Sequence, residues 1–200
     1  MSRTALFDAA KAWDAAAVRR VLAEKPALAT ATDPNGRVAL HVCAKRSYPG
    51  HHRESAAGIA TMRALLEGGT PFDIVHAIPE DGATFPATPL WYAVAHGRNP
   101  PMTRQLLDLG ARPDHCLFGA VWYDEADILQ MLLDAGAPID PVVEGATPLV
   151  YAARLGRLES IRTLVKAGAS IDATDRKGRT PYLLAREKKV PTAVLGLLQG

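Results

Sequence analysis

Four residues with metal-binding side chains lie close together in the first third of the chain: His41, Cys43, His51 and His52. Imidazole nitrogens and thiolates are the ligands that zinc prefers in proteins. Zinc binding is therefore the first function that these residue types indicate. The two adjacent histidines, however, lie in a stretch of loop composition, Ser47 to Glu54, and supply only half of a ligand set.

A second pair of reactive types is His115 followed by Cys116. A thiol at the N-terminus of a helix can have a lowered pKa and act as a nucleophile. Adjacent residues rarely direct both side chains to one point, so we do not expect thiol catalysis here. The sequence contains no G-x-S-x-G, H-E-x-x-H or phosphate-loop motif. It therefore predicts a protein that is not an enzyme, without catalytic residues or a cofactor.

The composition excludes several classes of protein. Of 200 residues, 48% are hydrophobic and 22% are charged, as in a folded, soluble chain. No apolar run reaches the roughly 18 residues of a membrane helix, and Asp8, Lys11 and Asp14 interrupt the start too early for a secretory signal. Two cysteines make no disulfide framework. We expect a cytoplasmic protein that does not contact membranes.

The overall charge gives little support for nucleic-acid binding. The formal net charge is only +2. Basic residues do cluster near the end, in D-R-K-G-R-T (175–180) and R-E-K-K (186–189), but Tyr182 is the only aromatic residue interleaved with them. We interpret this cluster as the polar outer face of a terminal repeat, and we expect no nucleic-acid partner.

The elements that must position these residues follow a repeating pattern. Its best copy, Gly145 to Asp175, contains T-P-L-V-Y-A-A-R-L-G, and the pattern begins again at Gly178. Thr147 can cap a helix whose first residue is Pro148. The apolar residues at 158, 161, 164 and 165 lie on one face of a second helix. The spacing of 33 residues between Thr147 and Thr180 predicts helix pairs that stack on one another.

A period of 33 residues with a T-P-L-x-x-A core resembles the ankyrin repeat. The resemblance implies an all-α solenoid of helix-turn-helix units, joined by β-hairpin fingers of unequal length. It covers the whole chain as a single domain, 1–200, with atypical first and fourth copies. The expected repeats span approximately 4–34, 35–75, 82–114, 115–142, 143–175 and 176–200.

Three departures from the family pattern are visible. Residues 47–54 are an insertion between the helices of the second repeat, and residues 74–86 lengthen the finger before the third. The turn between the two helices of the third repeat, N-P-P, is one residue longer than is usual in the family. The fourth repeat lacks its finger, and only A-R-P-D (111–114) remains. Insertions in such arrays often lie on a functional face.

The resemblance also bears on the metal ligands. His41 matches the family's structural histidine, whose ring usually bonds the backbone of the next loop. Cys43 occupies a core-facing alanine position. Neither side chain is then free to bind a metal, so we expect no metal site.

Ankyrin repeats mostly act as non-catalytic scaffolds that bind a protein in the groove formed by fingers and first helices. The resemblance therefore implies a protein partner, here unidentified, bound by a monomer. The groove positions that we select as protein-binding are Lys45, Arg46, His96, Trp122, Tyr123 and Arg154.

Two readings stay open for these positions. Trp122 and Tyr123 are either an aromatic anchor for the partner or a cover over a helix that lost its finger. The cations either face an acidic rim on the partner or are simply solvated. The alternative function is an accessory protein that contacts a small ligand, a peptide or a metal through the inserted loop 47–54 and the long finger 74–86.

Overall fold

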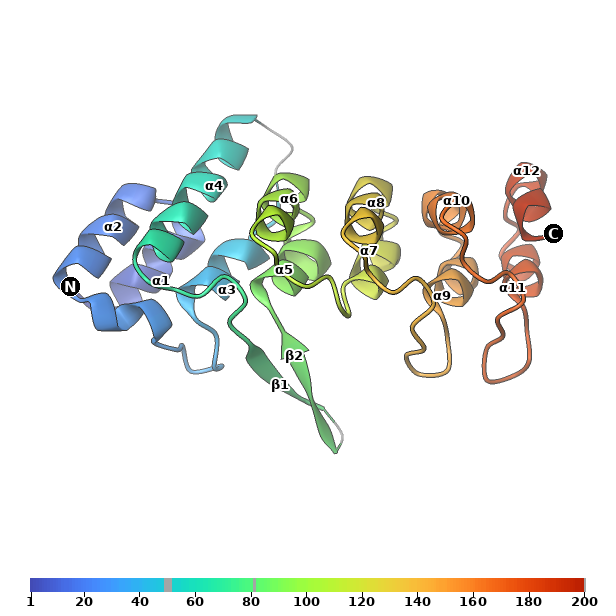
Figure 1. The fold of residues 1–200 in the computed structure, drawn as a ribbon, viewed down its shortest axis with the longest axis horizontal. Coiled ribbons are helices and arrows are strands. Elements are labelled where there is room, and N and C mark those ends of the chain that lie inside the picture. The colour runs from blue at the N-terminus through green and yellow to red at the C-terminus, as the bar shows by residue number, and fades with distance from the viewer. Residues whose placement is uncertain (49–51, 81, 200) are drawn as a thin grey trace. The chain divides into compact units, whose positions relative to one another are not determined.

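The computed structural model describes residues 1–48, 52–80 and 82–199, and the side chains of residues 52–55 are not part of this description. The chain forms two compact units. Unit 1 is Met1–Arg112 and unit 2 is Pro113–Gly200. Each unit contains helix pairs in which a first helix is followed by a short turn and a second helix (Figure 1). The expectation of a single domain stays a prediction.

Unit 1 contains three helix pairs and the only two strands in the described residues. Its elements are α1 (Arg3–Ala12), α2 (Ala15–Glu24), the 3-10 helix η1 (Pro26–Thr30), α3 (Ala39–Lys45), α4 (His52–Glu67), β1 (His76–Glu80), β2 (Ala83–Ala87), α5 (Pro89–Tyr92), the π-helix η2 (Ala93–Gly97) and α6 (Pro100–Asp108).

Unit 2 contains three further helix pairs. Its elements are α7 (Leu117–Tyr123), α8 (Ala126–Asp134), α9 (Pro148–Leu155), α10 (Leu158–Lys166), α11 (Pro181–Glu187), α12 (Thr192–Leu195) and the 3-10 helix η3 (Gly196–Leu198). None of the described helices is both long and apolar enough to cross a membrane.

The capping threonines begin their helices where the repeat pattern places them. The hydroxyls of Thr88, Thr147 and Thr180 each accept a hydrogen bond from the backbone amide three residues later. A proline follows each threonine at the first helical position, where its missing N–H costs nothing. The start of helix α9 at Pro148 is therefore confirmed.

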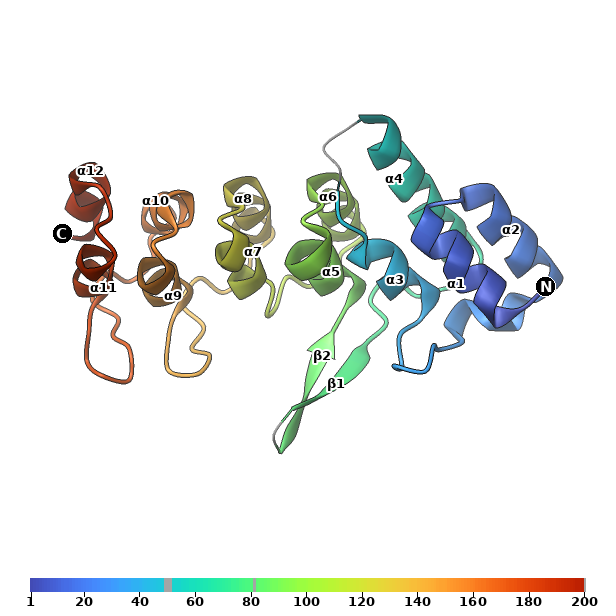
Figure 2. The same ribbon diagram turned by 180° about the vertical axis from the view of Figure 1, so that it is seen from behind.

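Short apolar side chains form the core of each unit. In unit 2, Leu149, Ala152 and Ala153 of α9 are fully buried, and so are Ile161 and Leu164 of α10. Alanines on the first helices allow neighbouring pairs to pack closely. Helices α9 and α11 lie side by side in both views (Figures 1 and 2).

Most first helices end in the left-handed backbone region, whereas α3 ends at Arg46 with extended backbone. The repeat uses Gly156 there, with φ of 71°, but Trp13, Asp124 and Lys189 adopt the same conformation at the matching positions. Asp124 has a second role, because its carboxylate accepts hydrogen bonds from the backbone amide and hydroxyl of Ser160, both at 2.7 Å. This carboxylate caps the N-terminal end of α10 in the next pair.

The inserted loop is shorter than the sequence predicts. Helix α4 begins at His52, so residues 52–54 belong to a helix and not to a loop. The backbone amide of Tyr48 donates to the carbonyl of Gly97 at 2.8 Å, which fixes the start of the insertion against the end of the next first helix. His51 lies outside the described residues.

The extra residue in the third pair is accommodated by a π-helical turn. The backbone amide of Asn99 reaches back to the carbonyl of Ala93, whereas the matching amide of Arg157 bonds the carbonyl of Ala152. Widening the last turn of the helix absorbs one residue without disturbing the start of α6. The sequence prediction that this turn is one residue too long is thereby explained.

The long finger is an antiparallel hairpin that projects from the helices of unit 1 (Figure 1). Strands β1 and β2 pair from His76 opposite Ala87 to Glu80 opposite Ala83. The ring of Phe85 packs on Trp91, with 5.1 Å between centroids, and ties the hairpin to α5. No hairpin separates α6 from α7, as expected for a deleted finger.

Candidate protein-binding surfaces

The aromatic pair of α7 is exposed because the other face of that helix is buried. Leu117, Ala120 and Val121 pack into the core, which leaves Trp122 and Tyr123 on the opposite side. Trp122 is 48% exposed and Tyr123 is 40% exposed. Because tryptophan and tyrosine are enriched at interfaces, two adjacent exposed rings make this pair the leading candidate for a contact surface in unit 2.

Trp122 is not isolated on this surface. Its ring stacks on Tyr151 of α9, with 6.2 Å between centroids and an angle of 27° between planes. Phe118, one helical turn before Trp122, meets the same tyrosine edge-on at 5.5 Å. The rings of α7 and α9 therefore make one aromatic surface, in which Trp122 and Phe118 both contact Tyr151.

Arg154 extends this surface with positive charge. Its guanidinium carbon lies 5.0 Å from the centre of the Tyr151 ring, within the range of a cation–π contact. Burial raises the pKa of the Tyr151 hydroxyl, while the charges of Arg154 and Arg157 act to lower it. We name Phe118, Trp122, Tyr123, Tyr151 and Arg154 the aromatic surface of unit 2.

In unit 1 the candidate cations have different surroundings. Lys45 is exposed at the end of α3. Arg46 donates hydrogen bonds to the carbonyls of Lys11 and Ala12, and its guanidinium lies 4.4 Å above the ring of Trp13. Arg46 therefore satisfies carbonyls at the end of α1, a structural role that sequence patterns do not reveal.

His96 lies in η2, directly after α5, and its ring contacts two aromatic rings of α5. It stacks on Tyr92 at 5.4 Å and meets Trp91 edge-on at 5.1 Å. Burial lowers the pKa of His96, and the positive charges of Lys45 and Arg37 lower it further. The positive charge of Lys45 therefore lies near enough to His96 to act on it.

His41 has the structural role that the family resemblance implies. Its Nδ1 accepts from the amide of Val38 at 3.1 Å, and its Nε2 bonds the carbonyl of Ile74 at 2.9 Å. A carbonyl only accepts and an amide only donates, so the ring is neutral with its proton on Nε2. Burial lowers the pKa of His41 to about 4.

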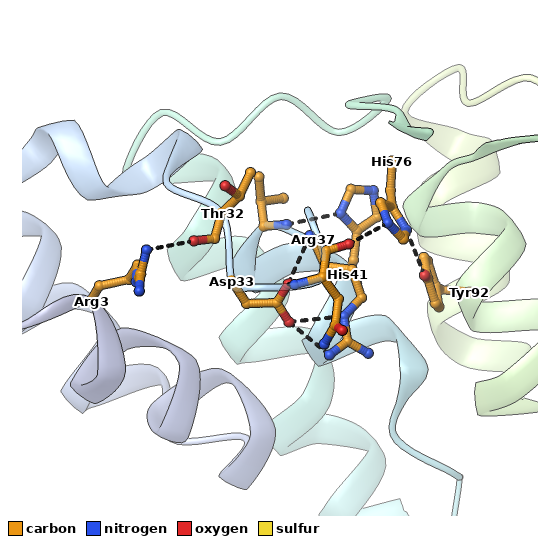
Figure 3. Close-up of polar contacts among 9 residues, drawn as sticks. Arg3, Thr32, Asp33, Arg37, His41, His76 and Tyr92 are labelled. Atoms are coloured by element: carbon orange, nitrogen blue, oxygen red, sulfur yellow. Dashed lines mark hydrogen bonds and ion pairs between the residues drawn. The ribbon is translucent and has the colours of Figure 1, made fainter. Parts of the chain in front are cut away.

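A second histidine, His76, completes this network and was not selected from the sequence. Its Nε2 donates to the carbonyl of Asn35 at 2.7 Å, and its Nδ1 bonds the hydroxyl of Tyr92 at 2.8 Å (Figure 3). Because Asn35 lies in the preceding finger and His76 begins β1, this ring links two fingers to α5. Its only sequence signal is a single histidine within the lengthened finger.

The cysteines and histidines do not form a chemical centre in the described part of the chain. No group of three or more metal-binding side chains occurs among the described residues. Cys43 and Cys116 are free and buried, and burial raises the pKa of each thiol to about 12. A thiol with this pKa stays protonated near neutral pH, so a Cys116 thiolate nucleophile is not supported.

The comparisons with known proteins bear on the repeating helix pairs. A family model described as ankyrin repeats (3 copies) matches residues 117–200. Protein PhlB from Serratia liquefaciens is 39% identical over 97 residues, which are 44% of this chain and 43% of PhlB. The chain spans less than half the length of the curated relatives it matches.

Solved structures resemble the whole chain. An ankyrin repeat domain from Acinetobacter baumannii has a TM-score of 0.75 and 25% identity, covering 96% of this chain and 95% of that domain. The ankyrin repeat domain of Bcl-3, a member of the IkappaB family, has a TM-score of 0.62 and 22% identity, with 98% of each chain covered. Residues 117–200 are ankyrin repeats, and the chain as a whole has the fold of ankyrin-repeat domains.

Proposed function

We propose that this protein is a non-catalytic recognition module that binds a protein partner through the aromatic surface of unit 2. Ankyrin repeats are generally protein–protein interaction modules. The observation that carries the proposal is the half-exposed Trp122, held by Tyr151 and followed by Arg154. Tryptophan, tyrosine and arginine are the residue types that dominate binding energy at interfaces, at roughly 2 kcal/mol or more for an anchor.

The arrangement favours binding because the anchor is already ordered. Trp122 loses little further freedom on association, since Tyr151 supports one face of its ring. Lys45 and His96 form a smaller candidate surface in unit 1, which we propose as a secondary contact. For Arg46 we propose no direct contact with the partner. Its proposed role is to hold the end of α1 in place beside Lys45.

The proposal includes a compartment, a class of partner and an oligomeric state. Both cysteines are free, which fits a reducing compartment, and we propose the cytoplasm. The proposed partner is a protein and neither a nucleic acid nor a membrane, and the proposed binding species is the monomer.

The test is affinity capture from a lysate of the source cells, with variants that separate the alternatives. The Trp122→Ala/Tyr123→Ala protein should lose a partner that the wild type retains. The matched Trp122→Phe/Tyr123→Phe protein should retain it, because the aromatic contact area is largely kept. Circular dichroism should show equal helix content in all three.

Two results would overturn this proposal. Equal retention by the alanine and phenylalanine variants would make the aromatic surface dispensable. Loss of the partner only when the hairpin residues 78–85 are replaced by a short Gly-Ser turn would favour the long finger as the contact site. In that case the peptide-contacting alternative replaces the proposal.

A further inference from the structure

The two ends of unit 2 differ sharply in charge. Residues 113–144 contain seven Asp and Glu and no Lys or Arg, whereas residues 145–200 contain ten Lys and Arg against four Asp and Glu. The modest net charge of the whole chain conceals this contrast. The positive residues are therefore concentrated on the last two helix pairs.

Most acidic residues of this positive region form ion pairs with arginines of the same region. Asp175 and Glu187 both bond Arg179, at 2.7 and 3.1 Å. Glu159 pairs with Arg162 at 3.6 Å. The remaining cations at the ends of the first helices have no ion-pair partner among the described residues. They are Arg154, Arg157, Arg186, Lys188 and Lys189.

These five residues, which we name the basic surface, come from two adjacent pairs. Helices α9 and α11 pack side by side (Figure 2). The stem of Lys188 lies against Gly156, since a Cβ added to that glycine would be 3.5 Å from the Cβ of Lys188. Arg154 and Arg157 flank the same glycine, so charges from both helix ends meet there.

Local stability explains only part of this arrangement. Arg154 and Arg186 lie in the last turns of α9 and α11, where positive charge interacts favourably with the helix dipole. Arg157, however, precedes α10 at its N-terminal end, where the dipole disfavours a cation. Its Nε is buried without a hydrogen-bond partner in the described structure.

Lys189 is the other residue that local stability does not favour. It has φ of 57°, at the position where the preceding pair has Gly156. A non-glycine residue in the left-handed region costs roughly 1 kcal/mol. A long cation is therefore held at a place where glycine would suit the backbone better.

The basic surface is continuous with the aromatic surface through Tyr151. This ring lies between Trp122, at 6.2 Å, and the guanidinium of Arg154, at 5.0 Å. We infer that the partner segment bound by unit 2 is acidic, with an apolar or aromatic side chain against Trp122 and carboxylates along the basic surface. This inference rests on the proposed function and adds the chemistry of the partner.

The direct test uses a defined probe. A short fluorescein-labelled peptide of Asp and Glu residues around one Trp is titrated with the full chain by fluorescence anisotropy. Its Asn and Gln counterpart serves as the control peptide. The wild type should bind the acidic peptide and not the amide peptide, and added salt should weaken binding because charge pairs are screened.

Matched charge variants place the site. Arg154→Gln/Lys188→Gln/Lys189→Gln should bind the acidic peptide roughly tenfold more weakly, since three surface charge contacts are lost. Arg162→Gln/Lys166→Gln/Lys177→Gln removes the same charge from α10 and a finger, and should bind as the wild type does. Equal thermal unfolding of both variants shows that folding is not the cause.

Several outcomes would overturn the inference. They are equal weakening in the two variants, no binding of the acidic peptide by the wild type, and tighter binding of a single-stranded oligonucleotide or of anionic vesicles than of the peptide. Self-association at low salt that the first triple variant abolishes would identify a second copy as the occupant and also overturn it.

The capture experiment separates this inference from the proposed function. If the alanine aromatic variant loses the natural partner while the first triple variant keeps it, the proposed function stands and the acidic-segment inference falls. If the aromatic variant keeps the partner while the triple variant loses both partner and peptide, the acidic character of the partner stands, and the contact with Trp122 falls from both the inference and the proposed function.

Discussion

Acidification should destabilise unit 1 through a single residue, His41. The neutral ring accepts a hydrogen bond from Val38 through Nδ1 and donates one to Ile74 through Nε2. Protonation of Nδ1 turns the acceptor into a donor that faces another donor. The protonated ring also has to be desolvated, since His41 is fully buried.

The size of the effect follows from the pKa values. The pKa of His41 is lowered from 6.5 to about 4. Burial is the main cause, and the hydrogen bond to Ile74 opposes it, while the smaller effects of the charges of His76 and Arg37 lower the pKa and that of Asp33 raises it. Because the folded-state pKa is depressed, the unfolded chain binds more protons between these values. Stability is complete above pH 6.5 and falls as the pH drops toward 4. Linkage gives a loss of about 2 kcal/mol at pH 5.

The assay compares the wild type with His41→Gln, in which nothing titrates at this position. Both are placed in a Trp122→Phe background, so that fluorescence reports only Trp13 and Trp91 of unit 1. Urea unfolding is followed from pH 7.5 to pH 5. The variant should be less stable at pH 7.5, because the buried Val38 amide loses its acceptor. The difference should shrink by about 2 kcal/mol at pH 5.

The two proteins differ at one position only, so the difference between their stability curves isolates the contribution of His41. Parallel stability curves for the two proteins across this pH range would refute the reasoning. They would mean that His41 is protonated as easily in the folded chain as in the unfolded one.

Three further predictions concern stability in unit 2 and one concerns packing in unit 1. Thr147→Ala should lower the free energy of unfolding by about 1 kcal/mol through the lost cap, which is measured as a lower urea midpoint. An unchanged midpoint would show that the cap is not needed. Leu149→Ala should cost roughly 2–5 kcal/mol, measured the same way, because the side chain is fully buried. Asp124→Ala should cost about 2 kcal/mol, since it removes the cap on Ser160 and places alanine at φ of 60°, a left-handed conformation that Asp tolerates better; Asp124→Asn should retain part of the cap and lose less. Gly97→Ala should destabilise unit 1 by roughly 1–3 kcal/mol in tryptophan-monitored urea unfolding, because the added methyl meets the carbonyl of Ala44; wild-type stability would contradict this packing.

The regular parts of the fold were predictable because each depends on neighbouring residues. A threonine followed by proline predicts the start of α9, and Gly156 predicts its end. The exposure of Trp122 and Tyr123 also follows from sequence, because Leu117, Ala120 and Val121 define the buried face of the same helix. The lengthened finger was visible as extra residues between two helix signals.

Contacts between distant segments were not predictable in this way. The bond from Arg46 to the end of α1 joins residues more than thirty positions apart, and no local pattern announces it. The same holds for His76, whose partners Asn35 and Tyr92 come from different repeats. The single residue of surplus in the third turn was visible in sequence, but its accommodation as a π-helical turn depends on three-dimensional packing.

The clustering of basic residues in unit 2 can be seen in the sequence, but the ion pairs that some of them form cannot. From sequence alone, we interpret the cluster at 175–189 as the polar face of a terminal repeat. The structure separates its members, because Arg179 is held by Asp175 and Glu187, whereas Lys188 and Lys189 are not paired in the described residues. Pairing of this kind depends on side-chain geometry and is not encoded in the spacing of charges.

The most direct measurement of the central proposal is site-specific photocrosslinking to the captured partner. A photoreactive phenylalanine analogue is placed at Tyr123, on the aromatic surface, and separately at Gln130, which is exposed on the second helix α8. We expect a crosslink to the partner from position 123 and none from position 130. A crosslink from position 130 alone would contradict it, because the partner would then bind the opposite helix layer of unit 2.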